Sequence, residues 1–240
     1  MPGEAEIIKV AASLKGQVPT DCRIFPLYGR LDFKDQQNAI KPLSDGRKIV
    51  LATNVAETSL TIEGIDHVID SGLSKRSIYD SSSGMARLVT QKISKSEADQ
   101  RMGRAGRLAP GNCYKLWSKS QDGSFPDFSP AESEKSDLTP FVVELALWGG
   151  NVDDLALLTK PNKNAISEAH KVLQMLEAID EKLQITKQGR SLSKIPLHPR
   201  LSKIILSGAQ DAPLLASILS DADPLEHSRN TDTVSYTHLR

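Results

Sequence analysis

Three arginines and two glycines alternate between Gln100 and Arg107, a segment that reads QRMGRAGR. On a helix, Gln100, Arg104 and Arg107 would fall at i, i+4 and i+7 and would share one face. Each glycine costs a helix interior about 1 kcal/mol relative to alanine, but it allows close backbone approach. Guanidinium groups stay charged and bind oxyanions in a fork. The segment therefore predicts a phosphate-contacting helix over residues 99–107. A plain basic surface helix, the alternative, explains neither glycine.

A cluster of hydroxyl and amide side chains follows a short β-rich run at residues 48–53. The cluster lies in the segment ATNVAETSLTI, from Ala52 to Ile62. Ligands of open α/β sheets bind beyond the carboxyl ends of strands, where such side chains can contact phosphates without reading bases. The same pattern is equally typical of a polar loop that caps a helix, so its meaning depends on the rest of the chain.

The first half of the chain alternates helical and strand patterns, which predicts a parallel, doubly wound sheet. Two alternating segments within residues 76–92 flank a Ser-Ser-Ser-Gly turn and predict a β-hairpin. The expected helices are residues 4–14, 35–40 and 99–107. The expected strands are residues 23–28, 48–53, 65–70 and 113–117.

The second half changes character after a polar segment, residues 118–136, that holds two prolines. Helices over residues 138–148 and 164–179, followed by short strands at 183–185 and 192–195, form a winged-helix pattern. Helices at residues 201–208 and 212–219 would begin another helical unit. Residues 233–240 match nothing before them and are interpreted as a non-native tail.

The composition excludes several classes of protein. Thirty basic and thirty acidic side chains leave no net charge that would point to nucleic acid, although residues 75–107 are locally basic and residues 122–154 mostly acidic. No apolar run approaches the roughly 18 residues of a membrane span, and no secretory signal is visible. Cys22 and Cys113 lack metal-like spacing. We expect a cytoplasmic protein with no membrane partner and no metal ligands in this chain.

Taken together, the two polar segments resemble motifs of the DEAH-box ATP-dependent RNA helicases of superfamily 2. Ala52–Ile62 resembles motif V (TNxAETSxTI), and Gln100–Arg107 resembles motif VI (QRxGRxGR). The resemblance covers residues 1 to about 228, and in this family the β-hairpin between the two motifs helps to separate strands. It implies a second RecA-like domain at residues 1–118, with its N-terminal strand missing, a linker and winged-helix domain at 119–196, the start of a helical ratchet domain at 197–230, and the tail at 231–240.

The resemblance also implies a role for each matched residue. Arg104 and Arg107 would act on the γ-phosphate of ATP, and Gln100 would help to place the attacking water. The nucleotide and its ribose would lie at Ser59, Thr61 and Glu63, the last standing where many relatives carry Asp. Ile40 matches the position where some relatives stack adenine on an aromatic side chain. The backbone of single-stranded RNA would be contacted at Gly29, Arg30, Thr53 and Asn54.

The sequence also lacks one half of such a motor. It contains no GxxxxGK[ST] phosphate loop. Ser167–His170 reads SEAH, but it lies within an amphipathic helix pattern and not at a strand end. The resemblance therefore implies a missing N-terminal RecA-like domain that supplies the phosphate loop and the Mg²⁺ ligands, and a fragment that is inactive toward ATP alone. A non-catalytic nucleic-acid-binding module and a DNA-directed helicase remain alternatives.

Overall fold

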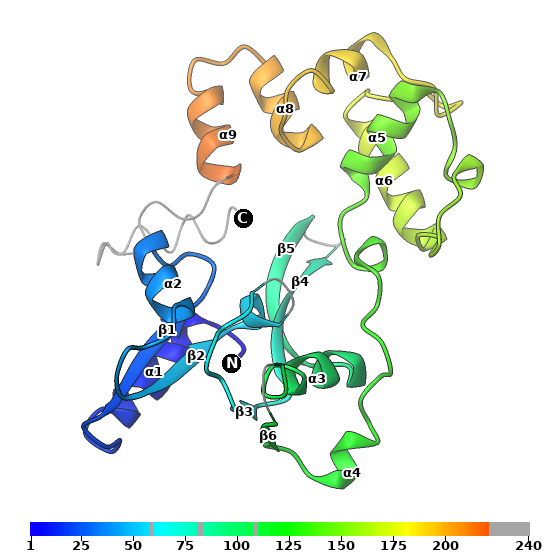
Figure 1. The fold of residues 1–240 in the computed structure, drawn as a ribbon. Helices are drawn as coiled ribbons and strands as arrows, with labels where there is room; N and C mark the ends of the chain where they lie inside the picture. The colour runs from blue at the N-terminus through cyan, green and yellow to red at the C-terminus, as the bar shows by residue number, and fades with distance from the viewer. Residues whose placement is uncertain (58–59, 81–83, 108–109, 221–240) are drawn as a thin grey trace. The chain divides into compact units, whose positions relative to one another are not determined.

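The computed structural model describes residues 1–57, 60–80, 84–107 and 110–220 (Figure 1), and the chain folds into two compact units. Unit 1 comprises residues 1–76 and 88–129. Unit 2 comprises residues 77–87 and the chain from residue 130 onward. The chain therefore passes from one unit to the other within both strands of the hairpin and again after Ser129.

Unit 1 is an α/β unit built on parallel strand pairs, as predicted. Leu27 at the end of one strand lies opposite Ala52 at the end of its partner, and Asp70 lies opposite Lys115 in the second pair. Parallel neighbours need a crossover connection, and a helix lies in each one. The paired strands are β1 (Cys22–Leu27) with β2 (Arg47–Ala52), and β3 (His67–Asp70) with β6 (Asn112–Lys115). The helices are α1 (Glu4–Leu14), α2 (Phe33–Ile40), α3 (Lys95–Met102), α4 (Lys119–Asp122) and the 3₁₀ turn η1 (Asn54–Ala56).

The core of unit 1 lies between its helices and strands. Ile7 of α1, Leu27 of β1 and Ala39 of α2 are completely buried, so these helices are held by apolar contact with the β1–β2 pair. A second cluster of Ile93, Ala98 and Phe125 is covered by Trp117 and fixes α3.

The predicted hairpin is confirmed. β4 (Leu73–Asp80) and β5 (Met85–Lys92) form a two-stranded sheet of their own. Its base belongs to unit 1, and its outer part, residues 77–87, belongs to unit 2.

Unit 2 is mainly helical. Val142 and Val143 of α5, together with Leu173 of α6 and Leu192 of α7, form the centre of its apolar core. Gly149 has a φ of 85° and caps α5, which ends at residue 148 as predicted. Among the described residues, no helix is long and apolar enough to cross a membrane. The elements are η2 (Glu132–Glu134), α5 (Thr139–Trp148), η3 (Val152–Asp154), α6 (Lys163–Met175), α7 (Lys187–Leu192), α8 (Pro199–Leu206) and α9 (Ala212–Ser220).

The strands predicted in unit 2 need correction. The strand at residues 192–195 is wrong, because the chain forms α7 over residues 187–192. The Thr186 hydroxyl accepts a hydrogen bond from the Gly189 amide at 3.0 Å and caps this helix. Gly189 packs so closely that a Cβ would lie 2.1 Å from the Ala178 carbonyl oxygen. The strand at residues 183–185 is reduced to one antiparallel bridge between Ile179 and Ile185.

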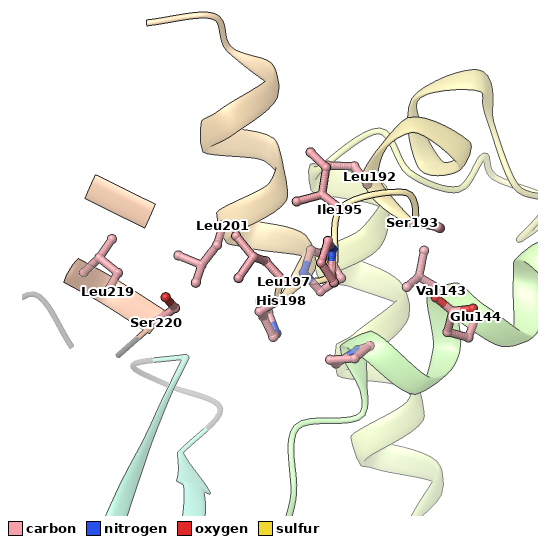
Figure 2. Close-up of a pocket in the computed structure, with 13 residues that line it drawn as sticks. Val143, Glu144, Leu192, Ser193, Ile195, Leu197, His198, Leu201, Leu219 and Ser220 are labelled. Atoms are coloured by element: carbon pink, nitrogen blue, oxygen red, sulfur yellow. The ribbon is translucent and has the colours of Figure 1, made fainter. Parts of the chain in front are cut away.

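A mostly apolar pocket of about 600 Å³ opens in unit 2 (Figure 2). Leu201 and Leu219 lie toward one side of it, and Val143 and Glu144 lie toward the other. All of the site residues predicted from the sequence belong to unit 1, whereas the residues that line this pocket belong to unit 2.

Candidate nucleotide and nucleic-acid site

The loops after β1 and β2 lie side by side at the carboxyl edge of this strand pair. The Thr53 amide donates to the Leu27 carbonyl oxygen at 3.1 Å, which holds the two strand ends together. Gly29 and Arg30 follow β1 and are exposed, while Thr53 is half-buried and Asn54 is exposed at the start of η1. The structure therefore brings together the four residues predicted to contact a nucleic-acid backbone.

Helix α2 fixes the shape of the first loop. The side-chain amide of Gln36 donates to the Leu31 carbonyl oxygen at 2.6 Å and to the Gly29 carbonyl oxygen at 3.5 Å. A Cβ on Gly29 would meet no atom within 4 Å, so space is open beside this backbone. Such an opening lets a ligand phosphate approach the loop closely. Ile40, the predicted adenine contact, is half-buried at the end of the same helix.

The helix predicted over residues 99–107 is shifted toward the N-terminus and is shorter at its end. α3 ends at Met102, and Gly103 is its C-cap. The Arg104 and Ala105 amides then donate to the Arg101 and Met102 carbonyl oxygens, both at 3.1 Å, in tight i→i+3 turns. Arg104 and Arg107 consequently lie beyond the helix, and the predicted shared helical face with Gln100 is wrong.

Packing explains why the chain leaves the helix here. Ala105 is buried, and a Cβ on Gly111 would lie 2.3 Å from the Ala105 carbonyl oxygen and 2.5 Å from that of Asp66. The backbone after α3 therefore runs against the segment that enters β6. The start of α3 carries a local signal that the sequence prediction did not use, a capping box in which Ser94 and Glu97 bond each other's backbone amides.

Arg104 binds the backbone of the segment that resembles motif V. Its guanidinium donates to the Leu60 carbonyl oxygen at 2.9 Å and to the Glu57 carbonyl oxygen. The side chain is only partly buried. This contact brings motif VI onto motif V, two segments more than forty residues apart in the sequence.

Arg101 makes the most buried ionic contact between these motifs. Its guanidinium donates to Glu57 Oε2 and to Asp70 Oδ1, both at 2.9 Å, and to the Leu73 carbonyl oxygen at 3.2 Å. The three side chains are 11%, 11% and 3% exposed, respectively. Burial lowers the pKa of Arg101, but the two carboxylates outweigh burial and raise this pKa above its usual value. The sequence analysis did not select Arg101, although it lies within motif VI, or Glu57, which lies within motif V.

The remaining predicted residues lie on the surface of unit 1. Gln100, Arg107, Thr61 and Glu63 are all exposed. Ser59 lies outside the described residues. Gln100 and Arg107 are thus exposed to solvent, whereas Arg101 at the end of α3 and Arg104 after it hold the motif V segment in place. Exposed guanidinium and amide groups suit an anionic ligand.

Two parts of the chain match known families. Residues 5–109 match the helicase conserved C-terminal domain, and residues 169–197 match the winged-helix form of the helicase-associated domain HA2. The first match contains motifs V and VI, and the second contains the end of α6 and all of α7.

The chain is also similar to individual proteins of known name. The chain is 37% identical over 235 residues to the ATP-dependent RNA helicase HrpB of Escherichia coli, which covers 95% of this chain and 29% of that protein. It is 38% identical over 219 residues to the probable ATP-dependent RNA helicase DHR1 of Saccharomyces cerevisiae, covering 88% of the chain and 17% of DHR1. A crystal structure of E. coli HrpB superposes with a TM-score of 0.86 at 34% identity, over 100% of this chain and 31% of that one. The chain thus spans less than a third of the length of these relatives.

A parallel α/β unit that carries motifs V and VI, followed by a winged helix, defines the C-terminal part of a helicase motor. Over most of its length the chain is similar to proteins named as ATP-dependent RNA helicases, and it therefore resembles the C-terminal part of the DEAH-box helicases.

Proposed function

We propose that this chain is the second motor domain and winged helix of an enzyme that uses ATP hydrolysis to move along single-stranded RNA and to unwind duplexes. The observation that carries the proposal is the contact of Arg101 and Arg104 with the motif V segment, which leaves Gln100 and Arg107 exposed beside it. The family relationship supports the same reading, because HrpB and DHR1 are both named as ATP-dependent RNA helicases.

In this proposal, the nucleotide lies against motifs V and VI. Arg104 and Arg107 stabilise negative charge on the transferred phosphoryl group, and Gln100 orients the attacking water. Thr61 and Glu63 hold the ribose with Ser59 nearby, and Ile40 covers one face of the base. The guanidinium, amide and hydroxyl groups fit an anionic nucleotide. The phosphate loop and the carboxylates that hold Mg²⁺ come from a partner RecA-like domain, so the chain alone does not turn over ATP.

The RNA strand lies along the loops after β1 and β2. Amides near Gly29 and the side chains of Arg30, Thr53 and Asn54 contact successive phosphates, which gives affinity with little sequence preference. The β4–β5 hairpin separates the strands of a duplex ahead of the motor.

Cys22 and Cys113 are free thiols, which is consistent with a protein that acts in a reducing cytoplasm.

ATP turnover tests the proposal directly. The chain is joined to a phosphate-loop domain of the same family, and turnover is measured with and without single-stranded RNA or DNA. Arg107→Ala should lower RNA-stimulated kcat by about 10³-fold while nucleotide affinity changes little, because an arginine finger acts in the transition state. Arg23→Ala, which removes an exposed arginine of β1, is the matched control and should leave turnover unchanged.

Two outcomes would redirect the proposal. Unchanged turnover in Arg107→Ala would make motif VI a phosphate clamp of a nucleic-acid-binding module. Stimulation by DNA that equals stimulation by RNA would remove the RNA preference, because only contacts with 2′-hydroxyl groups distinguish the two strands at such loops.

A further inference from the structure

Arg200 donates two hydrogen bonds that attach the outer part of the hairpin to the remainder of unit 2. Arg200, at the start of α8, donates from Nη1 to the Gly84 carbonyl oxygen at 3.1 Å and from Nη2 to the Tyr79 hydroxyl at 3.4 Å. The Tyr79 amide also donates to the Lys135 carbonyl oxygen at 3.0 Å. Strand β4 and the end of the hairpin turn are therefore bonded to segments that follow residue 130.

Gly84 permits the close approach of this guanidinium. A Cβ at this position would lie 1.8 Å from Arg200 Nη1 and 2.7 Å from Arg200 Cζ. Its φ of +68° is also one that residues with side chains rarely adopt. The missing side chain at Gly84 thus leaves room for the Arg200 guanidinium, and the backbone conformation there favours glycine.

A partly buried network of hydrogen bonds holds Arg200 in place. Asp137 accepts a hydrogen bond from the Thr139 amide at 2.8 Å, and its other oxygen lies 2.9 Å from His198 Nε2. His198 Nδ1 in turn accepts from the Arg200 amide at 3.2 Å and caps α8. Because Nδ1 is an acceptor, Nε2 carries the ring hydrogen and donates it to Asp137. Tyr79 and Asp137 interact as well, so the network closes on the hairpin.

We infer that Arg200 is the positioning residue of the strand-separating hairpin, and that it ties residues 77–87 to the winged-helix side of the chain. The inference rests on the proposed function, since it concerns how hydrolysis is coupled to strand opening. A hairpin fixed to unit 2 keeps its place against a duplex while unit 1 responds to nucleotide. Without the hydrogen bonds from Arg200, part of the free energy of each ATP hydrolysis cycle would bend the hairpin.

Amide hydrogen exchange on the chain itself tests whether Arg200 holds the hairpin, without any enzyme assay. Arg200→Gln removes the charged donor and keeps a polar side chain. Exchange of the Tyr79 and Gly84 amides should become faster by on the order of tenfold, because a charge-assisted bond to the hairpin is lost. Tyr79→Phe, which removes only the hydroxyl, should give a smaller increase at Gly84. Arg190→Gln, at an exposed position on α7, is the control and should change neither amide. Unchanged exchange of both amides in Arg200→Gln would refute the inference that Arg200 holds the hairpin.

The rate of duplex unwinding tests whether Arg200 positions the hairpin for strand separation. In the chain joined to a phosphate-loop domain, Arg200→Gln should lower the rate of duplex unwinding by on the order of tenfold while RNA-stimulated ATP turnover is retained. Arg200→Lys, which keeps a donor, should restore part of the unwinding. Faster amide exchange with unchanged unwinding per ATP would refute the positioning role. Absence of RNA-stimulated turnover in the unmutated protein would refute the proposed function instead, and the exchange result would still stand.

Discussion

Replacing Arg101 by methionine should strongly destabilise unit 1, because two buried carboxylates would lose their counter-ion. Exposed ion pairs contribute about 0.2–1 kcal/mol, but Glu57 is 11% exposed and Asp70 is 3% exposed, so that range does not apply. Breaking a buried pair by removing one partner costs about 3–5 kcal/mol. Methionine fills most of the vacated volume, which limits any added cavity term. We therefore expect a loss of about 3–5 kcal/mol in the free energy of unfolding.

Urea unfolding followed by tryptophan fluorescence measures this loss in unit 1. Trp117 is partly buried there, with its ring centroid 5.3 Å from that of Phe125. Trp148, in unit 2, is replaced by Phe so that the signal reports unit 1 alone. With a urea dependence of about 1–3 kcal/mol per molar, the midpoint should fall by about 2 M.

The structure supplies a control with similar geometry and a different environment. Arg47 donates to both carboxylate oxygens of Asp21 at 2.9 and 2.8 Å, but these side chains are 63% and 51% exposed. Arg47→Met should cost less than about 1 kcal/mol. Equal losses from Arg101→Met and Arg47→Met would refute the reasoning from burial. So would a failure of Glu57→Gln with Asp70→Asn to recover stability in the Arg101→Met protein.

Two further predictions concern unit 2 and use Trp148 as the reporter after Trp117→Phe. Burial raises the pKa of Asp137, but hydrogen bonds from His198 and Thr139 outweigh burial and lower it from 3.8 to about 2. The stabilisation is therefore complete above about pH 4 and is lost as the pH falls toward 2. About 1–2 kcal/mol of unfolding free energy should disappear in that window, and Asp137→Asn should remove this pH dependence. Gly189→Ala should cost about 1–3 kcal/mol, since its Cβ would lie 2.1 Å from the Ala178 carbonyl oxygen. Gly123→Ala in unit 1, whose Cβ would meet only the Ser120 carbonyl oxygen at 3.7 Å, serves as the control for glycine replacement and is followed by Trp117 in a Trp148→Phe protein. An equal loss there would contradict the packing argument.

Local periodicity predicted most elements of the chain. The helix predicted at residues 4–14 has those limits in the structure, and the strands predicted from 23 and 48 begin within one residue of those positions. These elements each bury one face, and a buried face leaves a regular apolar pattern in the sequence. The errors at residues 99–107 and 192–195 occurred where tertiary contact decided the conformation. Gly189 packs on the Ala178 carbonyl oxygen and supports a helix, and Ala105 packs on Gly111 and ends one.

The candidate site was predictable in its chemistry but not in its contacts. The residue types of motifs V and VI indicated a phosphate-binding role, which stays a prediction, and the family resemblance assigned Gly29, Thr53 and Asn54 to the same nucleic-acid backbone. No local pattern could predict that Arg104 binds the backbone at Glu57 and Leu60, because the partners are 47 and 44 residues away. Arg200 and Gly84 are 116 residues apart and were missed for the same reason.

The discontinuity of unit 2 has a consequence for exchanging parts between relatives. Residues 77–87 are inherited in the sequence with unit 1, yet their bonding partners at Lys135 and Arg200 lie in the second half of the chain. A chimera joined at a single point between the two halves would therefore combine the hairpin of one protein with the anchor of another. A transplant of the winged helix between family members should carry residues 77–87 with it, so that position 84 meets the arginine for which it leaves room.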